Sequence, residues 1–105
     1  MPTVRIDSKC DPVPYNAPGW EDKYVTFETD LEWISITFFA GSPFKESTYL
    51  IKRGNPRKVK VMKGKGSSGG DGISYPYCLL DGEIKCPDCK PEDSYVPPPK
   101  MIIRK

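Results

Sequence analysis

The chain has 105 residues, of which 37% are hydrophobic and 29% charged, with a formal net charge of +2 and no histidine. A chain of this length forms one domain with a modest core, so residues 1–105 are predicted to be a single domain. The 11% aromatic content is typical of a folded chain rather than a disordered one. The lack of histidine excludes every catalytic or metal site that needs an imidazole.

Short strands of alternating polarity are the dominant pattern. Twelve prolines and nine glycines interrupt the chain, and no segment combines a 3.6-residue period with helical length, so almost no helix is expected. Apolar side chains recur at every second position in seven segments, which predicts seven strands that each bury one face. The predicted strands are Thr3–Asp7, Lys23–Thr29, Trp33–Phe39, Ser47–Arg53, Arg57–Lys63, Ile73–Leu80 and Lys100–Arg104.

The connections between these segments differ greatly in length. Lys9–Glu21 is predicted to be a proline-rich connection, and Gly64–Gly72 a flexible loop. Ser47–Arg53 and Arg57–Lys63 are separated by Gly54-Asn55-Pro56, which predicts a hairpin with a polar face. Lys85–Pro99 is a long excursion that carries cysteines. Short strands with unequal loops predict an all-β, two-sheet Greek-key sandwich.

Three segments resemble the cupredoxin-like family of β-sandwiches. Val25-Thr26-Phe27 followed by Trp33–Phe38 looks like the strand pair before that family's upstream copper ligand. Tyr75-Pro76-Tyr77-Cys78 is similar to the strand that ends in the copper cysteine, and Pro99–Arg104 to the closing strand. The resemblance covers most of the chain, although other sandwiches, including immunoglobulin-like ones, share these patterns.

The copper site itself is not carried over. A type 1 copper site needs two imidazoles and a thiolate, with a weak axial thioether. Cys78 supplies the thiolate, and Met101 or Met62 a thioether, but the chain has no imidazole. The resemblance therefore implies the scaffold without blue-copper electron transfer.

Four cysteines form the first candidate site. Cys86-Pro87-Asp88-Cys89 brings two sulfurs close together, and Cys78 and Cys10 would complete a four-thiolate site for zinc or, with soft ligands, Cu(I). Three alternatives stay open: disulfides, inert buried thiols and a redox dithiol. The redox alternative is the weakest, because the prolines after Cys89 prevent the helix that would lower a thiol pKa.

A dense run of cations forms the second candidate site. Residues 45–65 contain eight basic side chains and one acidic one, whereas residues 1–44 contain three basic and seven acidic. Such a patch attracts acidic partners, but it also describes a solvated edge protected by lysines, which is the favoured interpretation. Nucleic acid is disfavoured, because no aromatic side chains are interleaved. We define the basic patch as Lys52, Arg53, Arg57, Lys58, Lys60 and Lys63.

The remaining patterns favour a non-catalytic module. The carboxylates that are close in sequence, such as Asp30 and Glu32, lie in predicted turns, where no burial would perturb them. Trp20 and Trp33 are interpreted as plugs at the ends of the sandwich. We expect a binding or structural domain that works with a protein partner or by self-association, without a membrane span. No signal peptide is visible, which favours a cytoplasmic location.

Overall fold

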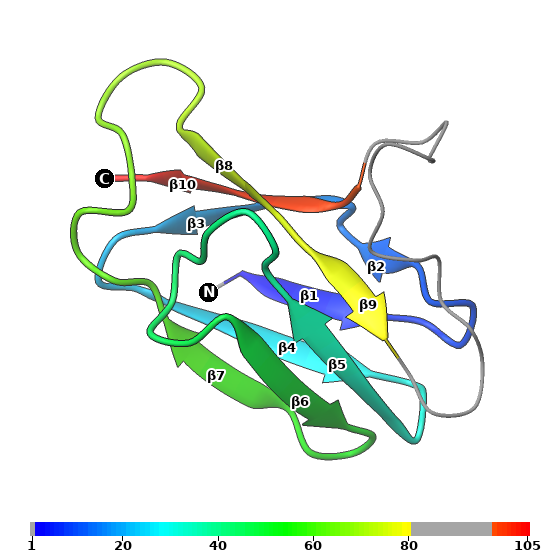
Figure 1. Cartoon of the computed structure of the whole chain (residues 1–105). Coiled ribbons are helices and arrows are strands. Elements are labelled where there is room, and N and C mark those ends of the chain that lie inside the picture. Colours follow the sequence, from blue (N-terminus) through cyan, green and yellow to red (C-terminus); the bar gives the residue numbers. More distant parts are fainter. Residues whose placement is uncertain (1, 81–97) are drawn as a thin grey trace.

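The chain folds into a β-sandwich, seen in a computed structural model that describes residues 2–80 and 98–105 (Figure 1). One layer is a four-stranded sheet with the order β2-β1-β4-β7. The other contains two three-stranded sheets with the orders β3-β10-β8 and β6-β5-β9. No helix occurs in these residues. The strands are β1 (Thr3–Ile6), β2 (Pro12–Val13), β3 (Asn16–Trp20), β4 (Tyr24–Thr29), β5 (Trp33–Thr37), β6 (Thr48–Lys52), β7 (Arg57–Lys60), β8 (Ile73–Pro76), β9 (Cys78–Leu80) and β10 (Lys100–Arg104).

The all-β prediction is confirmed, but the structure has ten strands where about seven were expected. Two of the extra strands, β2 and β3, lie in the segment predicted to be a connection. Their prolines disfavour an ordinary strand, but both strands lie at sheet edges, where a missing N–H is tolerated. The third arises because the predicted strand Ile73–Leu80 divides at Tyr77: β8 pairs with β10, and β9 pairs with β5.

The predicted hairpin between β6 and β7 is wrong. β6 pairs with β5 in one layer, whereas β7 pairs with β4 in the other. The turn at Gly54 therefore carries the chain between the layers instead of reversing it within one sheet. Both strands have one apolar face, and that pattern is the same whether the two strands pair with each other or face each other across a core.

The predicted inward positions are buried. Ile34, Ile36 and Ile51 are fully buried, and Val25 and Phe27 meet them from the opposite layer. Removing this apolar surface from water is the main stabilising contribution to the fold, at about 25 cal/mol per Å². The alternation in the sequence was therefore sufficient to identify the core face of each long strand.

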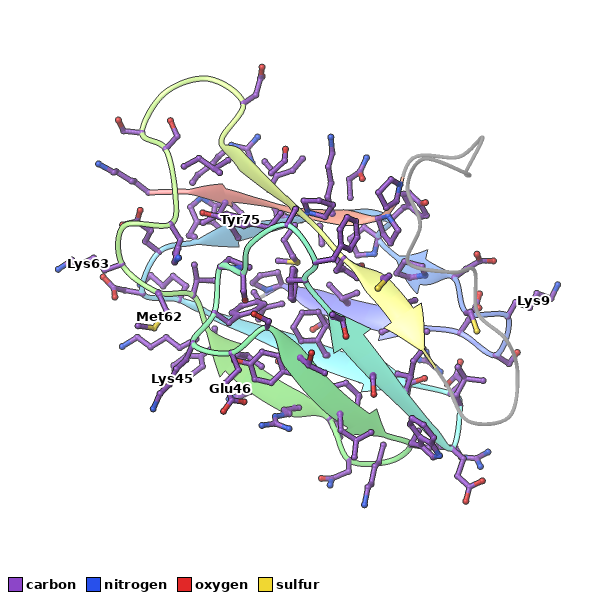
Figure 2. All side chains as sticks on the ribbon, in the orientation of Figure 1. Lys9, Lys45, Glu46, Met62, Lys63 and Tyr75 are labelled. Carbon is purple, nitrogen blue, oxygen red and sulfur yellow. The ribbon has the colours of Figure 1, made fainter. Side chains whose placement is uncertain are left out.

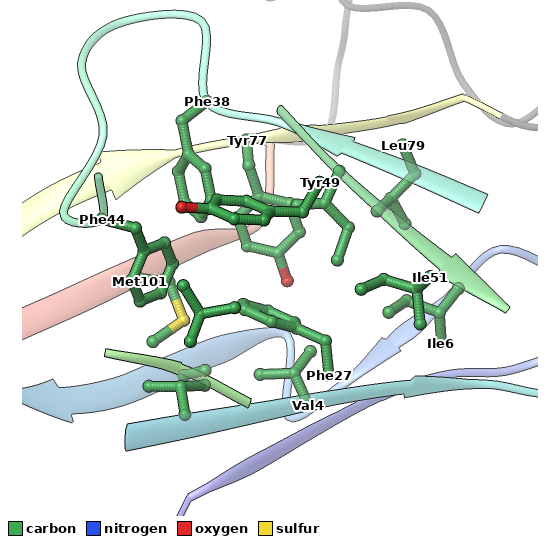
Figure 3. Packing of buried hydrophobic residues seen from close by; sticks show 14 of the residues in the cluster. Val4, Ile6, Phe27, Phe38, Phe44, Tyr49, Ile51, Tyr77, Leu79 and Met101 are labelled. Atoms are coloured by element: carbon green, nitrogen blue, oxygen red, sulfur yellow. The ribbon is translucent and has the colours of Figure 1, made fainter. Parts of the chain in front are cut away.

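Phe44 is a core residue that the sequence pattern did not indicate, since it lies in the turn between β5 and β6. Its ring packs edge-on against those of Phe27, Phe38 and Tyr49, with centroids 5.8, 5.4 and 5.9 Å away (Figure 3). The Ser42 hydroxyl oxygen accepts the N–H of Phe44 at 3.1 Å. A turn that looks polar in the sequence thus delivers an aromatic ring into the core.

The glycine-rich segment Gly64–Gly72, expected to be flexible, is held by specific hydrogen bonds. The N–H of Gly66 donates to the Glu21 carboxylate at 2.7 Å, and the Tyr75 hydroxyl donates to the Lys65 carbonyl at 2.6 Å. Ser67 pairs with Arg104 at the end of β10. A Cβ atom on Gly66 would lie 2.6 Å from the carbonyl carbon of Arg104, so the glycine permits this close approach.

Tyr77 and Tyr75 allow a matched test of core polarity. Tyr77 is fully buried, and its hydroxyl has no hydrogen-bond partner in the described part of the chain; burial raises its pKa. Because an unsatisfied buried hydroxyl is costly, Tyr77→Phe should raise the free energy of unfolding by about 1 kcal/mol, whereas Tyr75→Phe should lower it by about 1 kcal/mol. Urea denaturation measures both. Equal losses in the two variants would contradict an unsatisfied Tyr77 hydroxyl.

The hydrogen bonds of the Glu21 carboxylate to the glycine-rich loop make the stability of the protein depend on pH. The N–H groups of Gly66 and Gly64 stabilise its carboxylate and hold the pKa of Glu21 below its usual value of 4.5. A lowered folded-state pKa stabilises the protein above the unfolded pKa, and this contribution is lost as the pH falls through the folded value. Glu21→Gln should therefore lower Tm at pH 7, with the difference disappearing in acid. Glu46→Gln, at an exposed position of the same charge, is the control. A difference that persists in acid would contradict this role of the charge.

Candidate functional site

The first cysteine lies in a loop that a carboxylate organises. Asp7 follows β1, and its Oδ1 accepts the N–H groups of Lys9 at 2.8 Å and Asp11 at 3.0 Å. These bonds hold the pKa of Asp7 below its usual value. Cys10 lies inside this loop with φ of 64°, in the left-handed region, and its side chain is buried. The loop thus turns the sulfur inward although the segment itself is polar.

The second cysteine lies at the start of β9. Cys78 stands opposite Thr37 of β5 and is buried. It follows Tyr77, whose N–H donates to the Pro99 carbonyl at 2.9 Å just before β10 begins. The strand change at Tyr77 therefore places this sulfur in a different sheet from the tyrosine before it.

Cys10 and Cys78 are both disulfide-bonded. This is the disulfide alternative that the sequence left open, and a disulfide sulfur offers no thiolate to a metal. Cys86 and Cys89, the other members of the predicted four-thiolate site, lie outside the described residues. Within residues 2–80 and 98–105, no three metal-ligating side chains gather. Zinc or Cu(I) binding therefore stays a prediction that applies only to the reduced chain.

Alkylation tests the state of these sulfurs. In denaturant without reductant, Cys10 and Cys78 should resist iodoacetamide, and after reduction both should react, as peptide mapping by mass spectrometry can measure. The chain that has not been reduced should then copurify without stoichiometric zinc. Alkylation of both residues before reduction, together with bound zinc released by a chelator, would favour the thiolate site instead.

The basic patch is divided between two surfaces. Lys58 and Lys60 stand on the outer face of the four-stranded sheet, opposite Thr26 and Tyr24 of β4. Lys52 ends β6 in the other layer, and Arg53 follows it in the turn. Lys63 lies beyond the end of β7, at the side of the molecule opposite Lys9 (Figure 2). The cations close in sequence are therefore not one flat surface.

Arg57 links the two layers at their shared edge. It lies two residues before the buried Val59 and thus on the inward face of β7. Its guanidinium lies over the Tyr49 ring, 4.9 Å from the centroid, and Nη1 donates a long 3.5 Å hydrogen bond to the Leu50 carbonyl of β6. Alternation with Val59 was the sequence signal for this placement, but the sequence could not identify Tyr49 as the partner.

Arg57 also lines a depression of about 370 Å³ along β6, whose other lining residues are Leu50, Lys52, Asn55 and Pro56. Leu50 is 44% exposed there, so the depression has an apolar wall and two cations. A second depression, of about 190 Å³, is lined by Arg53 and by two carboxylates. One is Asp30, which accepts a 2.6 Å hydrogen bond from Arg5, and the other is Glu28, whose carboxylate lies 4.0 Å from the same guanidinium.

The aromatic side chains Trp20, Tyr24 and Trp33 do not gather into one binding surface. Trp20 lies on β3, Tyr24 on β4 and Trp33 on β5, each in a different sheet. Trp20 is 39% exposed and Trp33 is half-buried, so neither is a buried plug. Both tryptophans occupy outward positions of their strands, which explains their exposure.

Comparison with known proteins gives no relative. No protein-family model, curated protein or solved structure matches the chain, so the geometry alone must support a function. Among the described residues, no helix has the length and apolar character needed to cross a membrane.

Proposed function

We propose that this protein is a non-catalytic binding or structural β-sandwich module that lacks a blue-copper site and uses the basic patch to bind an acidic partner protein. One observation carries the proposal. Of the described cations, only Arg5 is in an ion pair, and the six cations of the basic patch are exposed with no carboxylate of the described chain within ion-pair distance. A concentration of uncompensated charge attracts and orients oppositely charged partners.

The carboxylates in the depressions support the non-catalytic part of the proposal. Asp30 and Glu28 are the acidic side chains that line one, and both interact with Arg5 across exposed surface. A general acid or base needs a carboxyl group placed in a cleft within reach of its substrate, whereas these two carboxylates already interact with a cation at the surface. The depression along β6 is lined by no carboxylate.

We also propose the cupredoxin-like, Greek-key form of the sandwich. Two features of the strand arrangement support it. The successive strands β2 and β3 lie in different layers, so one segment of chain contributes to both. β1 pairs in parallel with β4, and β10 in parallel with β3, so strands distant in sequence are neighbours in each layer. Long connections that return a strand beside one distant in sequence are typical of Greek-key sandwiches, although the Greek key itself is antiparallel and these two pairs are parallel.

The alternative function is a small metal-binding protein with a cysteine-thiolate zinc or Cu(I) site. It requires reduction of Cys10 and Cys78, which are disulfide-bonded. Disulfides persist in oxidising compartments and are rare in the cytosol. The bonded state therefore supports the binding module over the metal protein, and an oxidising compartment over the cytoplasmic location that the sequence favoured.

Retention on a heparin column tests the basic patch. Lys58→Ala/Lys60→Ala should elute at a clearly lower salt concentration than the wild type, because polyanion binding depends on the number of cations that contact it. Lys9→Ala/Lys100→Ala removes the same charge outside the patch and should elute close to the wild type. Equal shifts in the two double variants would mean that retention reports net charge, and the proposed binding surface would fail.

A further inference from the structure

We propose that the outer edge of β6 is a docking edge for an extended acidic segment of a partner protein, which adds to the sheet as a strand beyond β6. This inference rests on the proposed function, because it specifies which part of the acidic partner binds and where on the protein it binds. Strand addition obtains affinity from main-chain hydrogen bonds and specificity from the side chains that flank the edge.

The hydrogen bonds that flank β6 fix which of its backbone groups point outward. The N–H of Phe38 donates to the Ser47 carbonyl at 2.8 Å, and the N–H of Arg53 donates to the Glu32 carbonyl at 3.1 Å. In an antiparallel ladder, every second residue bonds to the neighbouring strand. Residues 47, 49, 51 and 53 therefore face β5, and the peptide groups of Thr48, Leu50 and Lys52 face away from it.

Those outward groups are only partly occupied. The N–H of Asn55 donates to the Lys52 carbonyl at 3.1 Å, and Arg57 reaches the Leu50 carbonyl at 3.5 Å. In the described chain, no strand pairs with this side of β6. Lys52 also forms an antiparallel bridge with Asn55, which engages its peptide groups. The N–H group of Leu50 and both peptide groups of Thr48 are thus available to an added strand.

The other edges of the described sheets are less suitable. β9 has only three residues. β2, β3 and β8 contain Pro12, Pro18 and Pro76, which remove donors from the ladder. β7 has no proline, but the next outward position after Lys60 is Met62, whose N–H already donates to the Pro43 carbonyl at 2.9 Å. β6 and β7 each offer two open outward positions, and β6 is distinguished by the depression beside it, which Leu50 and two cations line.

Charge identifies the occupant. Lys52 and Arg57 line the depression beside the edge, and no carboxylate lines it. Arg57 holds the Leu50 carbonyl by a long bond, and a carboxylate would give the same guanidinium a shorter, charge-assisted one. An acidic strand can therefore displace Arg57 from the carbonyl, bond to the freed oxygen and pair with the cation. Arg57 both covers the edge and recognises the partner.

A second copy of the chain fits this edge less well. An antiparallel pair of β6 strands centred on Leu50 would place each Lys52 opposite Thr48 of the other copy and bring two Arg57 side chains toward the same centre. Like charges in neighbouring positions of a ladder are destabilising. Charge complementarity thus favours an acidic partner over self-association through this edge.

The test uses a fluorescent seven-residue peptide of alternating glutamate and valine, titrated at low and high salt and followed by polarisation and by amide NMR. We expect salt-dependent binding that shifts the amides of Thr48 and Leu50. A peptide of the same sequence with alternate amides N-methylated keeps the charge but cannot pair along one edge, so it should bind at least about tenfold more weakly.

Two variant pairs separate edge pairing from general attraction. Leu50→Pro removes an outward N–H without taking a donor from the β5 ladder, and Leu50→Thr keeps that N–H at the same position. Leu50→Pro should therefore weaken peptide binding more than Leu50→Thr does. Arg57→Gln should weaken binding by about tenfold, because a charge-assisted bond is lost. Lys9→Gln, an equal change of charge at an exposed position outside the basic patch, should change it by less than about threefold.

Several outcomes overturn the edge inference. If the N-methylated peptide binds as tightly as its parent, or if Lys9→Gln weakens binding as much as Arg57→Gln, the protein attracts acidic chains without strand addition. If the same amides shift with protein concentration alone and light scattering shows dimers, the occupant is a second copy. In the first case heparin retention that depends on Lys58 and Lys60 still supports the proposed function. If heparin retention does not depend on Lys58 and Lys60, both the edge inference and the proposed function fail.

Discussion

The fold depends on the burial of one continuous apolar layer between two sheets. Ile34, Ile36 and Ile51 enter it from one side, and Val25 and Phe27 from the other. Phe44 closes the layer by edge-on contacts with rings from both sides, including Phe27 at 5.8 Å and Tyr49 at 5.9 Å. Because a close-packed core tolerates few voids, burial of this layer fixes how the two sheets face each other. The strand order within each sheet then determines which strands occupy the edge positions. The edge of β6 is one of those positions.

Packing and surface chemistry meet at Tyr49 and Arg57. The Tyr49 ring belongs to the core, yet it also supports the Arg57 guanidinium at 4.9 Å. The Tyr49 hydroxyl accepts the N–H of Glu46 at 2.9 Å, which holds the turn that carries Phe44. A single side chain thereby joins the core, the loop between β5 and β6 and the charged edge. Substitutions at Tyr49 would change all three together, so the surface residues are the better places to test binding.

The two candidate sites differ in how the fold treats them. The cysteine loop is constrained by local hydrogen bonds to Asp7, and Cys10 and Cys78 are disulfide-bonded, so this region stabilises structure rather than offering reactive thiols. The basic patch, in contrast, is exposed, has no carboxylate within ion-pair distance among the described residues and borders backbone groups open to a partner. A concentration of like charge destabilises a small domain by self-repulsion. Its presence therefore agrees with a role in solubility or recognition.

The sequence by itself determined the class of the fold and the buried face of each long strand, because alternation with a period of two is a local property of the chain. It could not determine that β6 and β7 lie in different layers, since one inward face satisfies either arrangement. Nor could it place Phe44 in the core or order Gly64–Gly72, because those contacts join residues far apart in sequence. Only the tertiary structure decided that Arg57 reaches β6, and with it which backbone groups remain open to a partner.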